Sequence, residues 1–115
     1  MAEYTLAHIG FNGANLEDAK KTAAMFETLF GWKVKEGNSS VFADTLVEVM
    51  KAPFLGEHGH IAVGTPDVAA AKAELEAKGF TFREDTAKYK PDGTLNAIYL
   101  TEEVAGFAIH LVGKK

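Results

Sequence analysis

Four residues that can bind a metal ion stand at matching places in two similar halves of the chain. His8 and His60 each lie in a short apolar segment near the start of a half, in residues 8–11 (HIGF) and 60–63 (HIAV). Glu48 and His110 each interrupt an apolar segment near the end of a half. Three imidazoles and a carboxylate suit a borderline divalent ion such as zinc, nickel, manganese or iron. The residue types and their repetition therefore predict a divalent-metal site made of these four side chains.

The alternation of side chains along a β-strand predicts that the four residues share one face of a sheet. In the first expected strand, one face holds Ala7, Ile9 and Phe11, and the other holds Leu6, His8 and Gly10. The bulkier face of each strand is the natural partner of the helices, which leaves the polar residues among smaller neighbours on the opposite face. His58 has the same parity as His60 and is a rival ligand, but its place at the end of a linker favours exposure to solvent.

Each half is expected to form a strand, a helix and three further strands. The expected strands are residues 4–11, 32–36, 40–43, 45–50, 59–64, 80–84, 95–100 and 106–112, with a polar loop at 86–94. This order predicts an α+β fold and one domain over residues 1–115. Two tandem βαβββ modules, residues 4–50 and 59–113, are joined by a linker at 51–58. Helices would cover one face of each sheet, and the other face would line a concave surface.

The two helices have recognisable ends. The first is expected to begin after Asn15, a candidate N-cap, and to stop at Gly31, which can adopt a positive φ. The second is expected to begin after Thr65 or Asp67, either of which can cap it, and to stop at Gly79. Helical spacing predicts buried stripes on both helices, formed by Leu16, Ala19, Ala23, Phe26, Leu29 and Phe30 on the first, and by Val68, Ala71 and Leu75 on the second.

Composition disfavours several classes of function. The formal net charge of −4 argues against non-specific nucleic-acid binding, which depends on cationic contacts to phosphate. The absence of cysteine excludes a disulfide scaffold and a thiolate–zinc site. No apolar run is long enough to span a bilayer, and the first residues do not form a secretory signal. We therefore expect a cytoplasmic protein with no nucleic-acid or membrane partner.

The sequence resembles the vicinal oxygen chelate superfamily, which includes glyoxalase I, extradiol dioxygenases, methylmalonyl-CoA epimerase, fosfomycin-resistance enzymes and bleomycin-binding proteins. The resemblance covers the whole chain and rests on the order of its segments: residues 8–11 (HIGF), 26–32 (FETLFGW), 59–63 (GHIAV), 67–68 (DV), 75–79 (LEAKG) and 106–111 (GFAIHL). It implies a glyoxalase-like fold, in which the modules form a cup-shaped mixed sheet. It also implies one metal ion held by the first and fourth strands of each module, at the positions of His8, Glu48, His60 and His110.

The first function that the resemblance implies is that of a metal-dependent lyase or isomerase of the glyoxalase type. The ion would bind two neighbouring oxygens of a small substrate and stabilise an enediolate. Glu48, the only carboxylate of the set, is the expected catalytic base. The family usually has glutamate at the position of His110, so His110 is either the fourth ligand or a proton donor.

The alternative is a non-catalytic protein of the bleomycin-resistance or accessory type, which would bind a small molecule in the same cup. Candidate residues for the walls of such a cup are Trp32, Phe42, Phe82 and Tyr99, with Arg83 or Lys33 against an anionic group. We expect a homodimer. The sequence leaves open whether the cup forms within one chain or between two.

Overall fold

One mixed β-sheet contains every strand among the residues that the structure describes. The computed structural model describes residues 2–114. The strand order is β2-β3-β4-β1-β5-β8-β7-β6, so each half of the chain supplies four neighbouring strands. The strands are β1 (Thr5–Asn12), β2 (Val34–Glu36), β3 (Ser40–Ala43), β4 (Val47–Met50), β5 (Gly59–Thr65), β6 (Phe82–Tyr89), β7 (Leu95–Val104) and β8 (Phe107–Gly113), and the helices are α1 (Leu16–Phe30) and α2 (Val68–Ala77). The predicted α+β fold, with the element order βαβββ twice, is confirmed.

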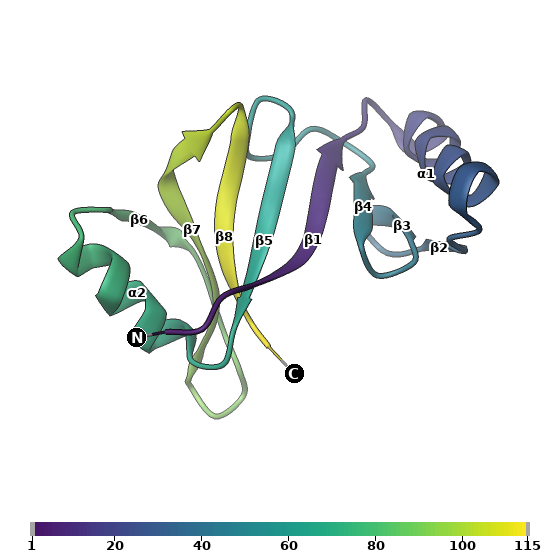
Figure 1. Ribbon diagram of the computed structural model, residues 1–115. Helices are drawn as coiled ribbons and strands as arrows, with labels where there is room; N and C mark the ends of the chain where they lie inside the picture. Colours follow the sequence, from purple (N-terminus) through teal and green to yellow (C-terminus); the bar gives the residue numbers. More distant parts are fainter. Residues whose placement is uncertain (1, 115) are drawn as a thin grey trace.

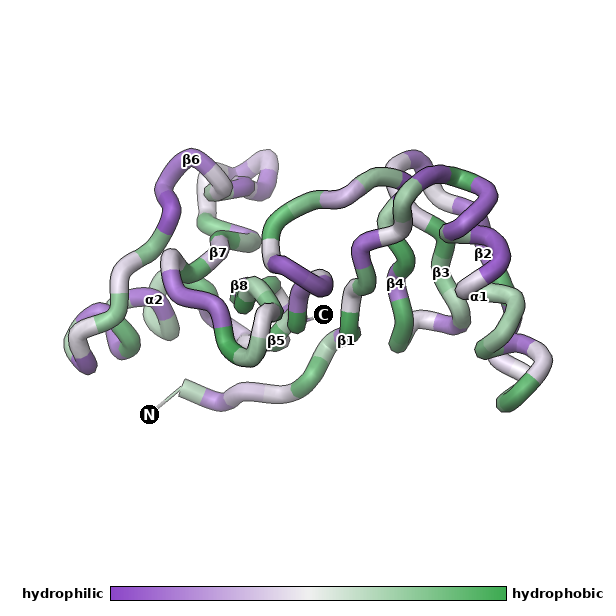
Figure 2. Tube along the Cα trace, turned by 90° about the horizontal axis from the view of Figure 1, so that it is seen from above, coloured by the Kyte–Doolittle hydropathy of each residue, from purple (hydrophilic) through white to green (hydrophobic). Residues whose placement is uncertain are grey.

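The sheet bends into an open cup, and its outer side carries the helices. α1 packs against β2, β3 and β4, whereas α2 packs against β7 and β8. The two helices therefore lie at opposite ends of the sheet (Figure 1), and the view from above shows the curvature that leaves the inner face open (Figure 2). The halves join where β1 pairs antiparallel with β5. One chain thus forms the cup by itself. None of the helices within residues 2–114 is long and apolar enough to cross a membrane.

Each helix covers a separate apolar core. The core under α1 consists of Ala19, Ala23, Val41, Ala43, Val47 and Val49. The core under α2 consists of Val68, Ala71, Ile98 and Leu111. Alanines on the helices let the backbones approach the sheet closely, as close packing of a small core requires. The stripe expected on α1 was partly wrong, because Leu16, Leu29 and Phe30 are 39%, 61% and 59% exposed.

The ends of both helices follow from local chemistry. The Asn15 side chain accepts a hydrogen bond from the backbone N–H of Asp18, and Gly31 ends α1 with a φ of 75°. Asp67, rather than Thr65, caps α2 by accepting from the backbone N–H of Ala70. These caps satisfy helix N–H groups that have no intrahelical partner.

Most strand boundaries differ from the sequence-based prediction by one or two residues, and β6 and β7 run further, to Tyr89 and Val104, past their predicted ends at 84 and 100. β2 begins at Val34, and Trp32 instead packs against the core under α1. β6 runs to Tyr89, through the first part of the loop predicted at residues 86–94. The pairing of Lys88 with Ala97 and of Tyr89 with Leu95 explains the longer strand, because a neighbouring β7 gives even a polar segment backbone hydrogen-bond partners.

A β-bulge at Ala7 changes which side chains of β1 face the cup. The register with β5 pairs Leu6 with Val63 and His8 with Ala62, so Ala7 is the extra residue. Cross-strand partners point to the same face, and Val63 lies on the outer face with Ile61. Leu6 therefore lies outside with Ile9, not inside with His8 as alternation predicted. The bulge leaves His8 and Gly10 on the inner face.

Candidate metal centre

The four predicted residues meet on the inner face because the strand registers place them in two neighbouring rows. In one row, Gly10 is the partner of both Glu48 on β4 and His60 on β5. In the other, Ala62 is the partner of both His8 on β1 and His110 on β8. In each row, a residue with little or no side chain thus has one polar side chain on each side of it. The repeat seen in the sequence becomes two similar rows, each of which contains residues from both halves of the chain.

Three polar atoms converge at the centre of the cup. Glu48 Oε1 lies 3.0 Å from His60 Nε2 and 3.3 Å from His8 Nε2, and the two Nε2 atoms are 3.2 Å apart. The second carboxylate oxygen, Oε2, accepts a hydrogen bond of 2.7 Å from Ser40 Oγ. A partly buried carboxylate needs polar partners, and the two histidines and Ser40 supply them.

His110 completes a group of three histidines. Each of His8, His60 and His110 offers one ring nitrogen, and these atoms lie within 4.8 Å of one another. Tyr99, the cross-strand partner of His110, stacks on its ring with a centroid distance of 4.4 Å and an interplanar angle of 8°. Both ring nitrogens of His110 are buried without a hydrogen-bond partner among the described residues. A buried, unpaired imidazole costs free energy unless another ligand satisfies it.

Protonation states in the cluster favour ligand binding. Burial lowers the pKa of His110 to about 3, with the charges of His60 and His8 adding to the effect. Its ring is therefore neutral near pH 7, as a metal ligand must be. Burial alone would raise the pKa of Glu48, but hydrogen bonds from His60, His8 and Ser40 outweigh it and hold this pKa well below its usual range. Glu48 is a carboxylate at neutral pH.

His60 owes its position to a missing side chain on the neighbouring strand. A Cβ atom added to Gly10 would overlap with three atoms of the His60 ring. His60 is 2% exposed, and its ring occupies the space above β1 that a side chain would fill. Gly10 therefore lets His60 reach across β1 toward Glu48.

A cavity of about 630 Å³ opens above the cluster. Its floor is formed by His8, Glu48, His60 and His110. Its walls come from the segment between β4 and β5 and from β6 and β7, and they include Phe54, Leu55, Arg83, Lys88 and Tyr99. This volume falls in the range of small-molecule sites, and apolar walls around a few converging polar groups are their usual form.

Asn12 fixes the wall formed by the segment between β4 and β5. Its side-chain oxygen accepts from the backbone N–H of Phe54 at 3.1 Å, and its side-chain nitrogen donates to the carbonyl of Gly56 at 2.9 Å. Phe54 in turn makes an edge contact with Tyr99 at a centroid distance of 6.0 Å. The end of β1 thereby ties the segment to the mouth of the cavity.

Only some of the candidate wall residues reach the cavity. Tyr99 and Arg83 line it, and Arg83 is paired with Asp85 at 3.0 Å. Trp32 and Phe82 instead pack in the two cores, and Lys33 does not line the cavity. Phe42 shares the inner face with Glu48 and approaches the His8 ring edge-on, at 6.3 Å between centroids.

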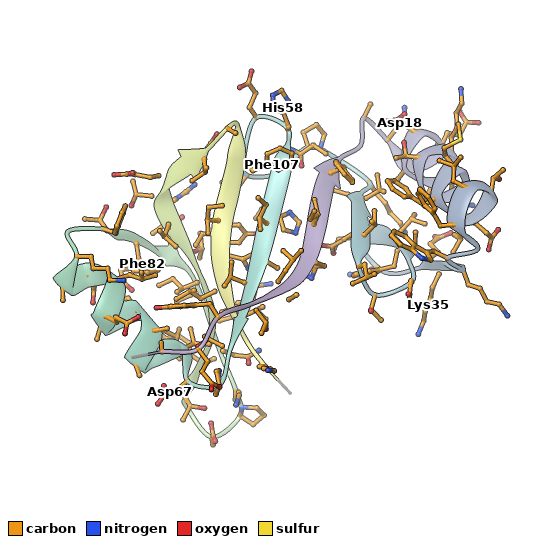
Figure 3. The ribbon with its side chains drawn as sticks, in the orientation of Figure 1. Asp18, Lys35, His58, Asp67, Phe82 and Phe107 are labelled. Atoms are coloured by element: carbon orange, nitrogen blue, oxygen red, sulfur yellow. The ribbon has the colours of Figure 1, made fainter. Side chains whose placement is uncertain are left out.

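The rival histidine lies at the rim of the sheet. The side chain of His58 is 59% exposed, and its ring lies 5.9 Å from that of Phe107. Figure 3 shows His58 and Phe107 at one end of the central strands. His58 also falls outside the group of three clustered histidines. Its predicted exposure is confirmed.

Sequence reasoning missed Ser40, Asn12 and the wall residues Phe54 and Leu55. Ser40 and Asn12 act through contacts with residues 8 to 44 positions away in sequence, so no local pattern marks them. Gly10 did carry a signal, because it occupies in the first half the place of Ala62 in the second. Two small residues at equivalent places in a repeat indicate a need for space.

Replacing Gly10 with alanine should damage the cluster. In a Gly10→Ala protein the new Cβ would displace the His60 ring, so metal affinity measured by calorimetric titration should fall and the protein should unfold at a lower temperature. Gly64→Ala is the matched control on the same face of β5, since the nearest atom that its Cβ would meet is the Thr5 hydroxyl oxygen, at 3.1 Å, and no atom of the cluster lies among its nearest neighbours. Equal metal affinity in the two variants would contradict this role for Gly10.

His110 should make the protein less stable in acid. Its lowered pKa means that the unfolded chain binds a proton at a higher pH than the folded protein does. The contribution of the neutral His110 ring to the free energy of unfolding is full above about pH 6.5. It is lost as the pH falls toward 3, at up to about 1.4 kcal/mol per pH unit. Urea unfolding at several pH values should show a flatter dependence for His110→Phe than for the unchanged protein. Identical slopes would refute the prediction.

Comparison with known proteins agrees with this geometry at the level of the fold. No family model and no curated protein sequence matches the chain. A hypothetical protein, BH1468 from Bacillus halodurans C-125, is structurally similar with a TM-score of 0.68 and 17% identity, covering 98% of this chain and 96% of that one.

Two methylmalonyl-CoA epimerases are similar as well. The Mycobacterium tuberculosis enzyme has a TM-score of 0.64 and 18% identity, covering 96% of this chain and 87% of that one. The Streptomyces coelicolor enzyme, in complex with 2-nitronate-propionyl-CoA, has a TM-score of 0.66 and 19% identity, covering 96% and 94%. These epimerases are members of the vicinal oxygen chelate superfamily. The chain thus has the glyoxalase-like fold of that superfamily, as the resemblance of its sequence implied.

Proposed function

We propose that the protein is a divalent-metal-dependent isomerase or lyase that acts on a small substrate with two neighbouring oxygens. The observation that supports this most directly is the convergence of His8, Glu48 and His60 beneath a cavity, with the unpaired ring of His110 beside them. The structural likeness to methylmalonyl-CoA epimerases supports the isomerase branch over the lyase branch. Substrates of an acyl-thioester or oxo-acid type fit this proposal.

The donor set fits a divalent ion. Ligand atoms around a tetrahedral ion at about 2.0–2.2 Å lie roughly 3.3–3.6 Å from one another. The atoms His8 Nε2, His60 Nε2 and Glu48 Oε1 are already 3.0–3.3 Å apart. His110 would be the fourth ligand, which would satisfy one of its unpaired nitrogens. Imidazole and carboxylate ligands suit zinc, nickel, manganese or iron.

The proposed chemistry divides among the residues around the cavity. A bound ion would act as a Lewis acid on two substrate oxygens and so stabilise the enediolate that proton loss produces. Glu48 is ionised at neutral pH and is the proposed base that takes the substrate proton. Burial, and then the charge of Glu48, raise the pKa of Tyr99 to about 12, so its neutral hydroxyl can donate a hydrogen bond to a ligand in the cavity. The apolar wall formed by Phe54 and Leu55 would exclude water.

Metal analysis followed by proton exchange tests the proposal. Native purification should yield a stoichiometric divalent ion, and His60→Ala should lose it. The loaded protein should exchange deuterium from solvent into an oxo-acid or acyl-thioester substrate, measured by NMR. Glu48→Gln should slow this exchange by about 10²–10⁴-fold, since a positioned base contributes that much. Asp85→Asn, which changes another carboxylate of the cavity, should leave it intact.

The outcomes separate three cases. A protein that binds none of the four ions would refute the metal site. A protein that binds an ion without exchanging substrate protons would be the non-catalytic small-molecule binder that the cup also suits. Full turnover in Glu48→Gln with metal still bound would remove Glu48 from the role of base.

We also propose that the protein forms a homodimer through the outer face of its central strands. Ile9, Ile61 and Ile109 are direct partners across β1, β5 and β8, and Leu6 on the same face is 60% exposed. None of these four belongs to either core. The helices pack toward the two ends of the sheet and leave this band between them (Figure 2). The three isoleucines are half-buried in the single chain, and an apolar patch that stays partly open to solvent is typical of an interaction surface.

Substitution at the centre of the band tests the dimer. Ile61→Lys should shift the protein from dimer to monomer in size-exclusion chromatography with light scattering, because a desolvated lysine would oppose apolar contact. Val104→Lys is the matched control, since Val104 is an exposed apolar residue, at 59%, near the end of β7 and outside the band. A monomeric unchanged protein would refute the proposal.

A further inference from the structure

Glu48 has two carboxylate oxygens in different surroundings. Oε1 faces the Nε2 atoms of His60 and His8, at 3.0 and 3.3 Å. Oε2 accepts the hydroxyl of Ser40 at 2.7 Å. The carboxylate therefore has one side directed at the proposed ion and the other side held by the protein. A free carboxylate makes no such distinction, because its two oxygens are chemically equivalent.

We propose that Ser40 is a positioning residue that makes Glu48 a one-oxygen ligand of the ion, an inference that rests on the proposed metal site. The Ser40 hydroxyl takes one lone pair of Oε2 and so fixes Oε1 as the oxygen that faces the ion, while the other lone pair of Oε2 stays available to a substrate proton. Hydrogen-bond partners of metal ligands orient those ligands and tune their affinity in many metal sites. In this site that role falls to a hydroxyl on β3, a strand that carries none of the proposed ligands.

The orientation, burial and backbone hydrogen bonds of Ser40 favour its contact with Glu48. Its side chain is on the inner face with Glu48, because Phe42, two residues along the strand, is the cross-strand partner of Glu48. Ser40 is 3% exposed, so bulk water does not compete for the hydroxyl. Its carbonyl accepts the backbone N–H of Gly37 at 2.7 Å and its Cα partner is Met50, so the backbone is tied on both sides. A hydrogen bond to an ionised acceptor in such a site is stronger than one between neutral groups.

One-oxygen binding by Glu48 has a consequence for the substrate. A carboxylate that binds through both oxygens occupies two positions around the ion. With Oε2 held by Ser40, Glu48 occupies one, and His8, His60 and His110 occupy three. A borderline ion that expands its coordination then keeps room for substrate oxygens on the side of the cavity. Ser40 would thus preserve the open positions that a chelating substrate needs.

Two isosteric pairs of side chains at position 40 test the inference, with Co²⁺ as the probe. Alanine lacks the hydroxyl that serine has, so Ser40→Ala is compared with the unchanged protein. Valine has nearly the shape of threonine but lacks its hydroxyl, so Ser40→Val is compared with Ser40→Thr. Both variants without a hydroxyl should bind Co²⁺ about ten- to a hundredfold more weakly by calorimetry. They should also change the visible absorption of the bound ion, which reports its coordination number. Ser40→Thr should match the unchanged protein in both measurements.

Ser39→Ala is the matched control. Ser39 also lines the cavity and precedes Ser40 in the chain, but its side chain makes no hydrogen bond with the described residues of the cluster. It should leave Co²⁺ affinity and absorption unchanged. Circular dichroism checks the fold of each variant, and the threonine and valine proteins keep the comparison valid if Ser40→Ala does not fold.

The result that overturns the inference differs from the one that overturns the proposed function. Equal Co²⁺ affinity and equal absorption in Ser40→Thr and Ser40→Val would refute the role of Ser40 while leaving the metal site in place. Unchanged protein that binds no Co²⁺ would refute both. Weakened binding in Ser40→Val, together with no proton exchange in the unchanged protein, would support Ser40 and refute the proposed chemistry.

Discussion

The site depends on the space left by small residues between the strands that carry the polar side chains. Neighbouring strands lie about 4.7–4.9 Å apart, so residues two strands apart meet only if the strand between them has little side chain. Gly10 provides this gap for Glu48 and His60, and Ala62 provides it for His8 and His110. A Cβ atom at position 10 would occupy the volume of the His60 ring. The convergence of four polar groups is therefore a property of their neighbours as much as of the groups themselves.

The same convergence determines the electrostatics. Burial penalises every charge in the cup, yet Glu48 stays ionised because His60, His8 and Ser40 donate hydrogen bonds to it. Within residues 2–114 His110 has no such partner, and burial keeps its ring neutral. The two halves thus end in groups of opposite character, an anion in one and a neutral base in the other. The proposed divalent cation would satisfy both, because it would attract the carboxylate and accept the lone pair of the imidazole.

The outer face of the sheet packs against the helices, and the inner face carries the polar cluster. The helices pack on the outer face near the ends and form the two apolar cores, which hold the strand registers in place. The inner face is then free to carry polar residues at the centre, where the two halves join through β1 and β5. Because the two buried apolar clusters lie under the helices, the central strands can carry small residues and histidines on the inner face without interrupting either cluster. The bulge at Ala7 allows His8 to face inward and Leu6 outward within one strand.

The sequence alone determined the element order, the end of the first helix at Gly31, and the four polar residues that lie on the inner face. These features follow from local chemistry and from strand alternation, which a repeat shows twice. Tertiary structure decided the rest. The bulge at Ala7, the extension of β6 and the Asn12 and Ser40 contacts depend on which strands become neighbours, and no local pattern encodes that. Tertiary structure also decided that one chain completes the cup, because β1 of the first half pairs with β5 of the second in a single sheet.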